Sequence, residues 1–120
     1  MAFILRATAT KTDDQEWYIP ISPYLEQYYT AEDVSIVDAM RSYRNALTGS
    51  TANVVTSIIG NVYTADQEFD TLENAQSAQD KIYGSSMAAE RIAFHNMVKN
   101  KVASLPGAPQ YTVTSTIIEV

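Results

Sequence analysis

The feature that most constrains this chain is a set of four extended segments that carry very few charges. Residues 3–11, 54–59, 62–69 and 110–120 are rich in the β-branched and aromatic side chains that favour strands. Residues 3–11 alternate regularly, so that odd-numbered residues such as Leu5 share one face and even-numbered residues such as Arg6 share the other. The charged side chains of the four segments are Arg6, Lys11, Asp66, Glu68 and Glu119. Because neither face is strongly polar, we expect the sheet to be covered on both sides.

Residues 30–48 carry the pattern of an amphipathic helix. Thr30 is a suitable N-cap, and Asp33 stands where a capping box needs an acidic side chain. Apolar side chains then recur at spacings of four, three and four residues, which places them on one face: Ile36, Met40, Tyr43 and Leu47. Gly49 follows as the expected C-terminal stop.

Two further helices are expected before the last strand. Asp70 is the expected N-cap of the first, and Gly84 ends it. The buried side of this helix is expected to contain Leu72, Ala75, Ala78, Gln79 and Ile82. Ser86 is the expected N-cap of the second, which runs to about Ala103 before a Pro-Gly-Ala-Pro break. Its apolar stripe is expected to contain Met87, Phe94, Val98 and Leu105.

The middle strands are expected to form a hairpin. Gly60-Asn61 is a two-residue turn that suits the right-handed twist of strands. One long bent strand is the alternative for residues 53–69. Residues 15–29 are expected to form a structured connection that packs on the body of the domain.

The order of these elements is strand, helix, strand, strand, helix pair, strand. That order is typical of the split βαβ arrangement, which predicts a single α+β ferredoxin-like domain over residues 1–120. We expect a four-stranded antiparallel sheet with helices on one face. A chain of 120 residues has no further element for the other face. A second copy of the chain is the simplest cover, so we expect a homodimer.

Composition excludes several classes of function. The net charge is −6 and the eight basic residues are scattered, which disfavours binding to nucleic acid or to an anionic membrane surface. The chain contains no cysteine, so thiolate nucleophiles and disulfides are absent. No stretch approaches the length of a membrane span and the N-terminus does not have the pattern of a secretory signal, so a cytoplasmic location is expected.

The chain resembles a known group of proteins. The element order, the last strand after a proline turn, and the segment Glu68-Phe69-Asp70-Thr71-Leu72-Glu73-Asn74-Ala75 are similar to dimeric α+β-barrel proteins of the antibiotic-biosynthesis-monooxygenase-like group. The resemblance implies a small-molecule pocket between sheet and helices, and it allows cofactor-free oxygenation of an aromatic substrate. Haem-degrading members use an asparagine on the first strand, which this chain lacks. No cofactor is therefore expected.

Four side chains are candidates for lining such a pocket, and they are Arg6, Trp17, Tyr63 and His95. His95 is the single histidine and the one weak candidate for a catalytic base; a boundary residue with a hydrogen bond is the simpler interpretation. Trp17 and Tyr63 can equally be ordinary core or interface aromatics. No metal site is expected. The acidic residues at 66, 68, 70 and 73 lack the glycine and further oxygen ligands of a calcium loop.

Two hypotheses of function remain open from the sequence. One is a dimeric barrel that binds a small molecule, with a cofactor-free monooxygenase or isomerase as its enzymatic form. The other is a structural or assembly domain without enzymatic activity, whose contact surfaces are the sheet face and the tyrosines at 18, 24, 28 and 29.

Overall fold

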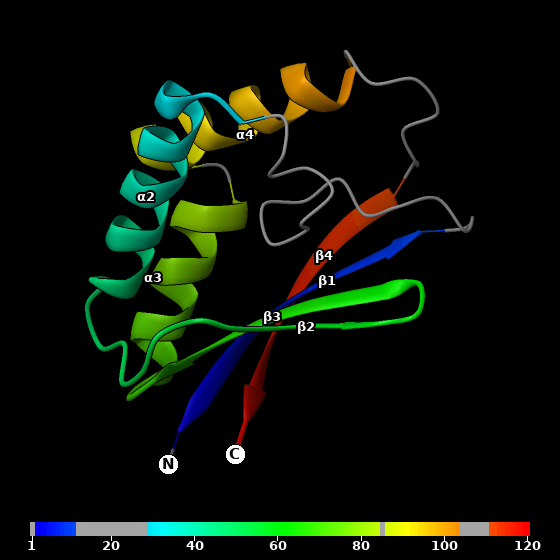
Figure 1. Ribbon diagram of the computed structural model, residues 1–120. Helices are drawn as coiled ribbons and strands as arrows, with labels where there is room; N and C mark the ends of the chain where they lie inside the picture. The colour runs from blue at the N-terminus through cyan, green and yellow to red at the C-terminus, as the bar shows by residue number, and fades with distance from the viewer. Residues whose placement is uncertain (1, 12–28, 85, 104–110) are drawn as a thin grey trace.

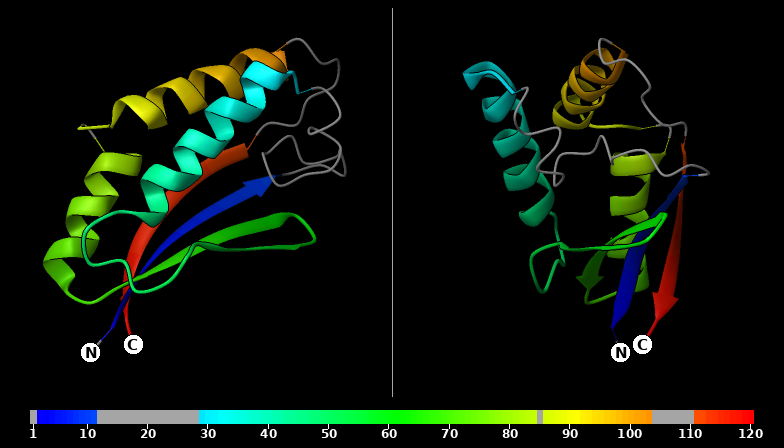
Figure 2. Two further views of the ribbon diagram at one scale, coloured as in Figure 1. Left: turned by 60° about the vertical axis from the view of Figure 1, so that its left-hand side comes forward. Right: turned by 45° about the vertical axis from the view of Figure 1, so that its right-hand side comes forward.

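The structure of the protein is a computed structural model, and it describes residues 2–11, 29–84, 86–103 and 111–120 (Figure 1). The elements in chain order are β1 (Phe3–Lys11), α2 (Ala31–Asn45), β2 (Val55–Ile59), β3 (Val62–Phe69), α3 (Leu72–Tyr83), α4 (Ala89–Ala103) and β4 (Tyr111–Glu119). The four strands form one antiparallel sheet in the order β2-β3-β1-β4. This is the predicted ferredoxin-like arrangement, and α2, α3 and α4 lie on the same side of the sheet (Figure 2).

The strand register divides the side chains between an inner face, toward the helices, and an outer face. Leu5 of β1 pairs with Gln67 of β3, and Ala7 pairs with Ala65. The buried strand residues all belong to the inner face, and they are Leu5, Ala7, Ala9, Ala65, Gln67 and Phe69. The alternation predicted for residues 3–11 is therefore confirmed.

The hydrophobic core lies where α3 packs on the sheet. Ala75 and Ala78 of α3 are buried against Leu5 and Phe69. Helix α3 contacts β1, β3 and β4, whereas α2 and α4 pack mainly against each other. Figures 1 and 2 show α2 and α4 side by side on the helix side, at the end away from the two chain termini. The core is thus concentrated at one end of the inner face.

Two of the three predicted helix starts are corrected by the structure. The capping box of α2 is confirmed, since Thr30 Oγ1 accepts from the Asp33 backbone N–H and Asp33 Oδ2 accepts from the Thr30 backbone N–H. In α3 the N-cap is Thr71, not Asp70, because the Thr71 hydroxyl accepts from the Asn74 backbone N–H. Asp70 instead accepts from the Asn74 side-chain amide.

Helix α4 differs more from its prediction. It begins at Ala89, three residues after the predicted cap Ser86, and the Ile92 N–H bonds the Ala88 carbonyl. Its buried side chain is Met97, which the predicted stripe omitted. Leu105 of that stripe lies outside the described residues. A helix that packs on another helix rather than on the sheet buries a narrower face, so its apolar pattern is weak.

The predicted hairpin is confirmed, and the single bent strand is wrong. Ile59 pairs with Val62, which leaves Gly60-Asn61 as a two-residue turn. Gly60 has φ +58°, as required of the first central residue of the primed turns that join twisted strands. Gly49, after α2, has φ +82°, and a Cβ there would collide with Asp70 and Asn74.

The two ends of the described chain are adjacent. The backbone N–H and C=O groups of Ala2 and Val120 bond one another at 3.3 and 2.9 Å. Figure 1 shows both termini at the same end of the sheet. None of the described helices is long and apolar enough to cross a membrane.

Candidate functional site

The half of the inner face farther from the core has a floor of small side chains. Ala7, Ala9 and Ala65 project from the two central strands and are 2–3% exposed. Ser115 of β4 is the neighbour of Ala7 in the sheet, and Tyr63 of β3 is the neighbour of Ala9. In the other half, Leu5 and Phe69 fill the space under α3. The two halves therefore differ in the bulk that the sheet itself supplies.

A buried amide borders this small-residue floor. Gln67 is 1% exposed and follows Ala65 on the inner face of β3. Its Nε2 donates to the Arg44 carbonyl at 2.7 Å and to Ser50 Oγ at 2.9 Å, and its Oε1 accepts from Arg44 Nε at 3.0 Å. These bonds satisfy the amide and fix the Arg44 side chain above the sheet.

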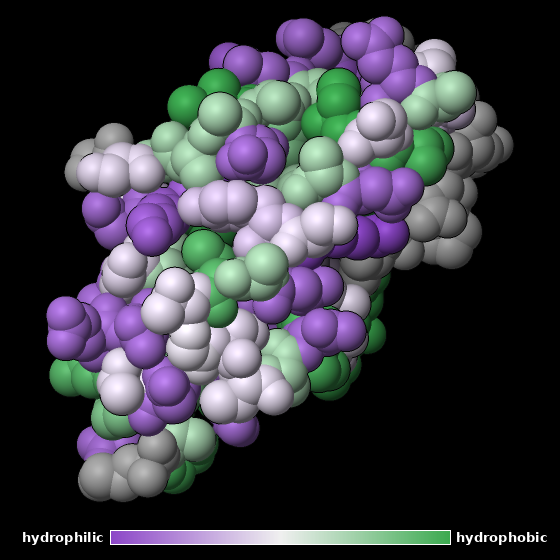
Figure 3. Space-filling view, turned by 90° about the vertical axis from the view of Figure 1, so that its left-hand side faces the viewer, coloured by the Kyte–Doolittle hydropathy of each residue, from purple (hydrophilic) through white to green (hydrophobic). Residues whose placement is uncertain are grey.

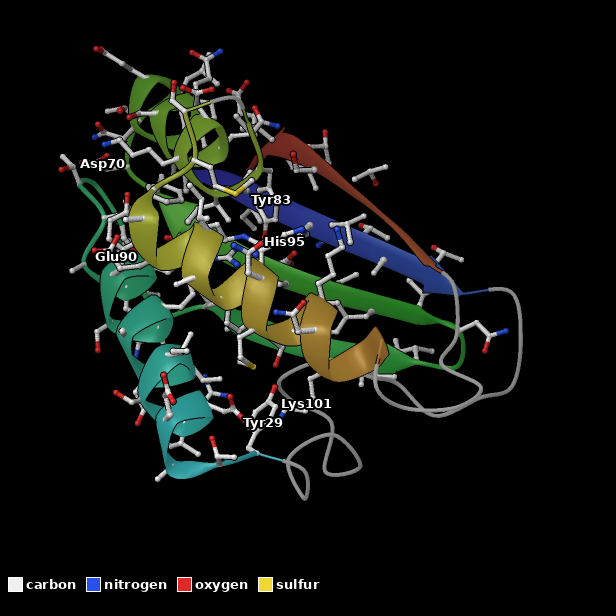
Figure 4. The ribbon with its side chains drawn as sticks, turned by 90° about the horizontal axis from the view of Figure 1, so that it is seen from above. Tyr29, Asp70, Tyr83, Glu90, His95 and Lys101 are labelled. Atoms are coloured by element: carbon white, nitrogen blue, oxygen red, sulfur yellow. The ribbon has the colours of Figure 1, made fainter. Side chains whose placement is uncertain are left out.

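An alternating stack of cations and aromatic rings joins the three helices. The Arg44 guanidinium of α2 lies 5.5 Å from the centre of the Tyr83 ring, at the end of α3. Arg91 of α4 lies 6.0 Å from the same ring and 5.5 Å from the ring of Phe94. Arg91 Nε also donates to the Ile82 carbonyl at 3.0 Å. Figure 4 shows Tyr83 close to α4. Such contacts are stabilising when the cation is partly desolvated.

Arg44 is not fully satisfied by these contacts. Its Nη2 is buried and has no hydrogen-bond partner in the part of the chain that the structure describes. The ion pairs among the described residues are Arg6–Asp66 and Lys101–Asp33, and neither includes Arg44. A buried cationic donor without an acceptor is unfavourable, because it has lost water without replacing it.

Two of the residues proposed from the sequence as a pocket lining, Arg6 and Tyr63, lie on opposite faces of the sheet. Tyr63 lies on the inner face of β3 and is half-buried. Arg6 lies on the outer face, where its Nε and Nη2 each donate to Asp66 at 2.8 Å. The hydrogen bond to Asp66 raises the pKa of Arg6 above its usual value. Trp17 lies outside the described residues.

His95 is an exposed side chain on α4. Partial desolvation lowers its pKa below 6.5, and the nearby positive charges of Arg91 and Lys99 lower it further. The described residues include no group of three or more His, Asp or Glu side chains that could hold a metal ion. A catalytic role for His95 therefore stays a prediction.

Sequence reasoning did not identify Arg44, Gln67 or Tyr83 as candidate site residues. One sequence feature pointed to Gln67. It occupies the buried phase of a strand whose other buried residues are Ala65 and Phe69. A polar side chain in that phase needs internal partners. The partners themselves, from α2, follow only from the tertiary arrangement.

Comparison with solved structures places the fold among ferredoxin-like α+β proteins. Rv0793 from Mycobacterium tuberculosis matches with a TM-score of 0.50 and 10% identity, over 100% of this chain and 95% of that chain. A dimeric ferredoxin-like protein from an uncultured marine organism matches at 0.49 with 16% identity, over 98% and 93%. A mutant of SnoaB, a cofactor-independent oxygenase from Streptomyces nogalater, matches at 0.48 with 8% identity, over 99% and 92%.

The TM-score of 0.50 to Rv0793 shows a shared fold and, at 10% identity, the fold alone. No protein-family model matches the chain, and no curated protein matches it in sequence.

Proposed function

We propose that this protein binds a small organic molecule on the inner face of its sheet, and that it acts as a homodimer formed through the outer face. The observation that carries the binding proposal is the small-residue floor of Ala7, Ala9 and Ala65. Three adjacent alanines on the central strands contribute little volume, and α2 and α4 pack mainly on one another. Ligand sites of this kind are mostly apolar with a few placed polar groups.

Filling the floor tests the binding proposal. N-phenylnaphthylamine, an uncharged fluorescent probe, is expected to bind the wild-type protein and to become more fluorescent. Ala9→Phe places a ring on the proposed binding surface and is expected to weaken this binding by about tenfold or more, since roughly 1.4 kcal/mol corresponds to tenfold. Far-ultraviolet circular dichroism and urea unfolding establish that the variant is folded.

The matched control is Thr114→Phe, which adds the same ring to an exposed position on the outer face of β4. It is expected to leave probe binding unchanged. Absence of probe binding to the wild-type protein would refute the proposal, as would equal binding to a folded Ala9→Phe variant.

The homodimer is supported by the apolar residues of the outer face. Val55 is 67% exposed and Ile59 is 78% exposed, and Val62, the partner of Ile59, is 39% exposed. The surface formed by α2 and α3 mixes hydrophilic and hydrophobic residues without a large continuous apolar patch (Figure 3). A stable dimer buries about 800 Å² on each partner.

Light scattering tests the dimer directly. The wild-type protein is expected to have twice the 13.3 kDa subunit mass, and Ile59→Lys is expected to shift it toward one subunit. Ile92→Lys, at an exposed position on α4, is the control and should leave the mass unchanged. A wild-type protein that remains a single subunit at high micromolar concentration would disprove the dimer.

A further inference from the structure

We infer that the bound molecule is a flat organic anion whose carboxylate pairs with Arg44. This inference rests on the proposed binding function and specifies the chemical class of the ligand. It rests on three observations: the incomplete bonding of Arg44, the absence of a counter-charge to it among the described residues, and the aromatic surfaces next to it.

The bonding of Arg44 is incomplete at one defined atom. Arg6 shows the complete arrangement, since its Nε and Nη2 donate to the two oxygens of one carboxylate at 2.8 Å each. Arg44 donates through Nε to a neutral amide oxygen, and its Nη2 is buried without an acceptor. A ligand carboxylate at Nη2 would supply the missing acceptor, and charge-assisted bonds of this kind are stronger than neutral ones.

The charge around Arg44 also favours an anion. The chain carries 14 acidic and 8 basic residues, and none of the acidic residues that the structure describes forms an ion pair with Arg44. Arg91 lies on the Tyr83 ring that Arg44 also contacts, so two cations share one ring. Like charges repel each other, and a carboxylate near Arg44 would lower this electrostatic cost.

The shape of the surroundings favours a flat ligand body. Tyr83 and Phe94 present aromatic rings beside the cations. Gln67 bonds Arg44, and Ala65 is the neighbour of Gln67 along the inner face of β3. The guanidinium therefore lies at the margin of the small-residue floor. A planar apolar group fits over alanine side chains while its carboxylate reaches the arginine.

The test compares two ligands that differ in charge. Naphthoate and naphthalenemethanol have the same ring system, and each is used to displace N-phenylnaphthylamine from the wild-type protein. Naphthoate is expected to bind about tenfold more tightly or better, as one charge-assisted hydrogen bond implies. The preference is expected to shrink at high salt, because a partly exposed ion pair is screened.

Variants locate the effect at Arg44. Arg44→Met is expected to abolish the preference for naphthoate while the uncharged probe still binds, and Arg44→Lys is expected to retain part of it. Arg41→Met removes an exposed charge from the same helix and is the matched control. Circular dichroism and probe binding report whether Arg44→Met is folded, and the wild-type comparison needs no variant.

The outcomes separate the two proposals. If the uncharged probe does not bind at all, the proposed binding function fails. If the probe binds but naphthoate and naphthalenemethanol displace it equally, the binding function stands and the anion inference is overturned, with water as the partner of Nη2. A naphthoate preference that persists unchanged in Arg44→Met would also overturn the assignment to this residue.

Discussion

Two arginines on opposite sides of the sheet have different partners. On the outer face, Arg6 is paired through two donors with a carboxylate from the adjacent strand. In the helix layer, Arg44 contacts a neutral amide and an aromatic ring. Its buried Nη2 has no acceptor among the described residues. Among the residues at 2–11, 29–84, 86–103 and 111–120, the charge of Arg6 has a counter-charge and that of Arg44 has none. A charge that is paired within the chain can be buried in an interface between subunits. A ligand site instead uses a polar or charged group that is available to pair with the ligand.

The largest expected effect contrasts two neighbouring residues of β1. Leu5→Ala removes a side chain that is 0% exposed and should lower the free energy of unfolding by about 2–5 kcal/mol. Ile4→Ala, on the outer face, should lower it less in dilute solution. Urea unfolding at low and high protein concentration measures both. Equal losses for the two variants in dilute protein would contradict the difference between the faces.

The next effect concerns the amide that holds Arg44. Gln67→Leu deprives Arg44 Nε, the Arg44 carbonyl and Ser50 of a partner, and each buried group left unsatisfied costs about 1–3 kcal/mol. Gln79→Leu is the control, because Gln79 is half-buried and its Nε2 donates a hydrogen bond to Ser115 Oγ. Chemical denaturation should show a clearly greater loss for the first variant. Similar losses would show that the network around Arg44 contributes little.

A smaller effect is expected from the outer ion pair. Asp66→Asn removes the charge that Arg6 bonds, and both side chains are partly exposed at 28% and 41%. Water screens such a pair, so the change in melting temperature should be slight in dilute protein. This change in melting temperature should grow with protein concentration if a second copy of the chain covers the ion pair. A large loss that does not depend on concentration would show that the pair stabilises the single subunit.

The smallest effect is a pH dependence at the start of α2. Hydrogen bonds from Lys101 and from the Thr30 backbone hold the pKa of Asp33 below its usual 3.8. Ionised Asp33 therefore contributes stability that is complete above pH 3.8 and is lost as the pH falls through the lower native value. Asp33→Asn should remove this part of the acid sensitivity. Asp38→Asn, at an exposed position on the same helix, should not.

The arrangement of the fold could be predicted from the sequence because it depends on local patterns. The alternation in residues 3–11, the capping box at Thr30 and the Gly60-Asn61 turn each fix one element. The N-cap of α3 was predicted wrongly because two neighbouring residues could each cap the helix. Asp70 and Thr71 are adjacent good caps, and only the position of the Asn74 backbone N–H decides between them.

The candidate site was less predictable because it is assembled from distant residues. Arg44 and Gln67 are 23 positions apart, and only Gln67, a polar side chain in the buried phase of β3, is unusual in its own segment. The sequence grouped Arg6 with Tyr63, yet odd and even positions of the paired strands place them on opposite faces. Pairing register and helix placement decide such relations, and no short pattern encodes them.

The strand order also has a consequence for how the chain folds. Strand β1 forms its ladders with β3 and with β4, so Phe3 pairs with Phe69 and with Glu119. The second ladder joins residues that are separated by almost the whole sequence, and closing such a loop is slow. Until residues 111–119 arrive, one edge of β1 is open to strands of other chains. Folding is therefore expected to be limited by this final pairing rather than by the local helices.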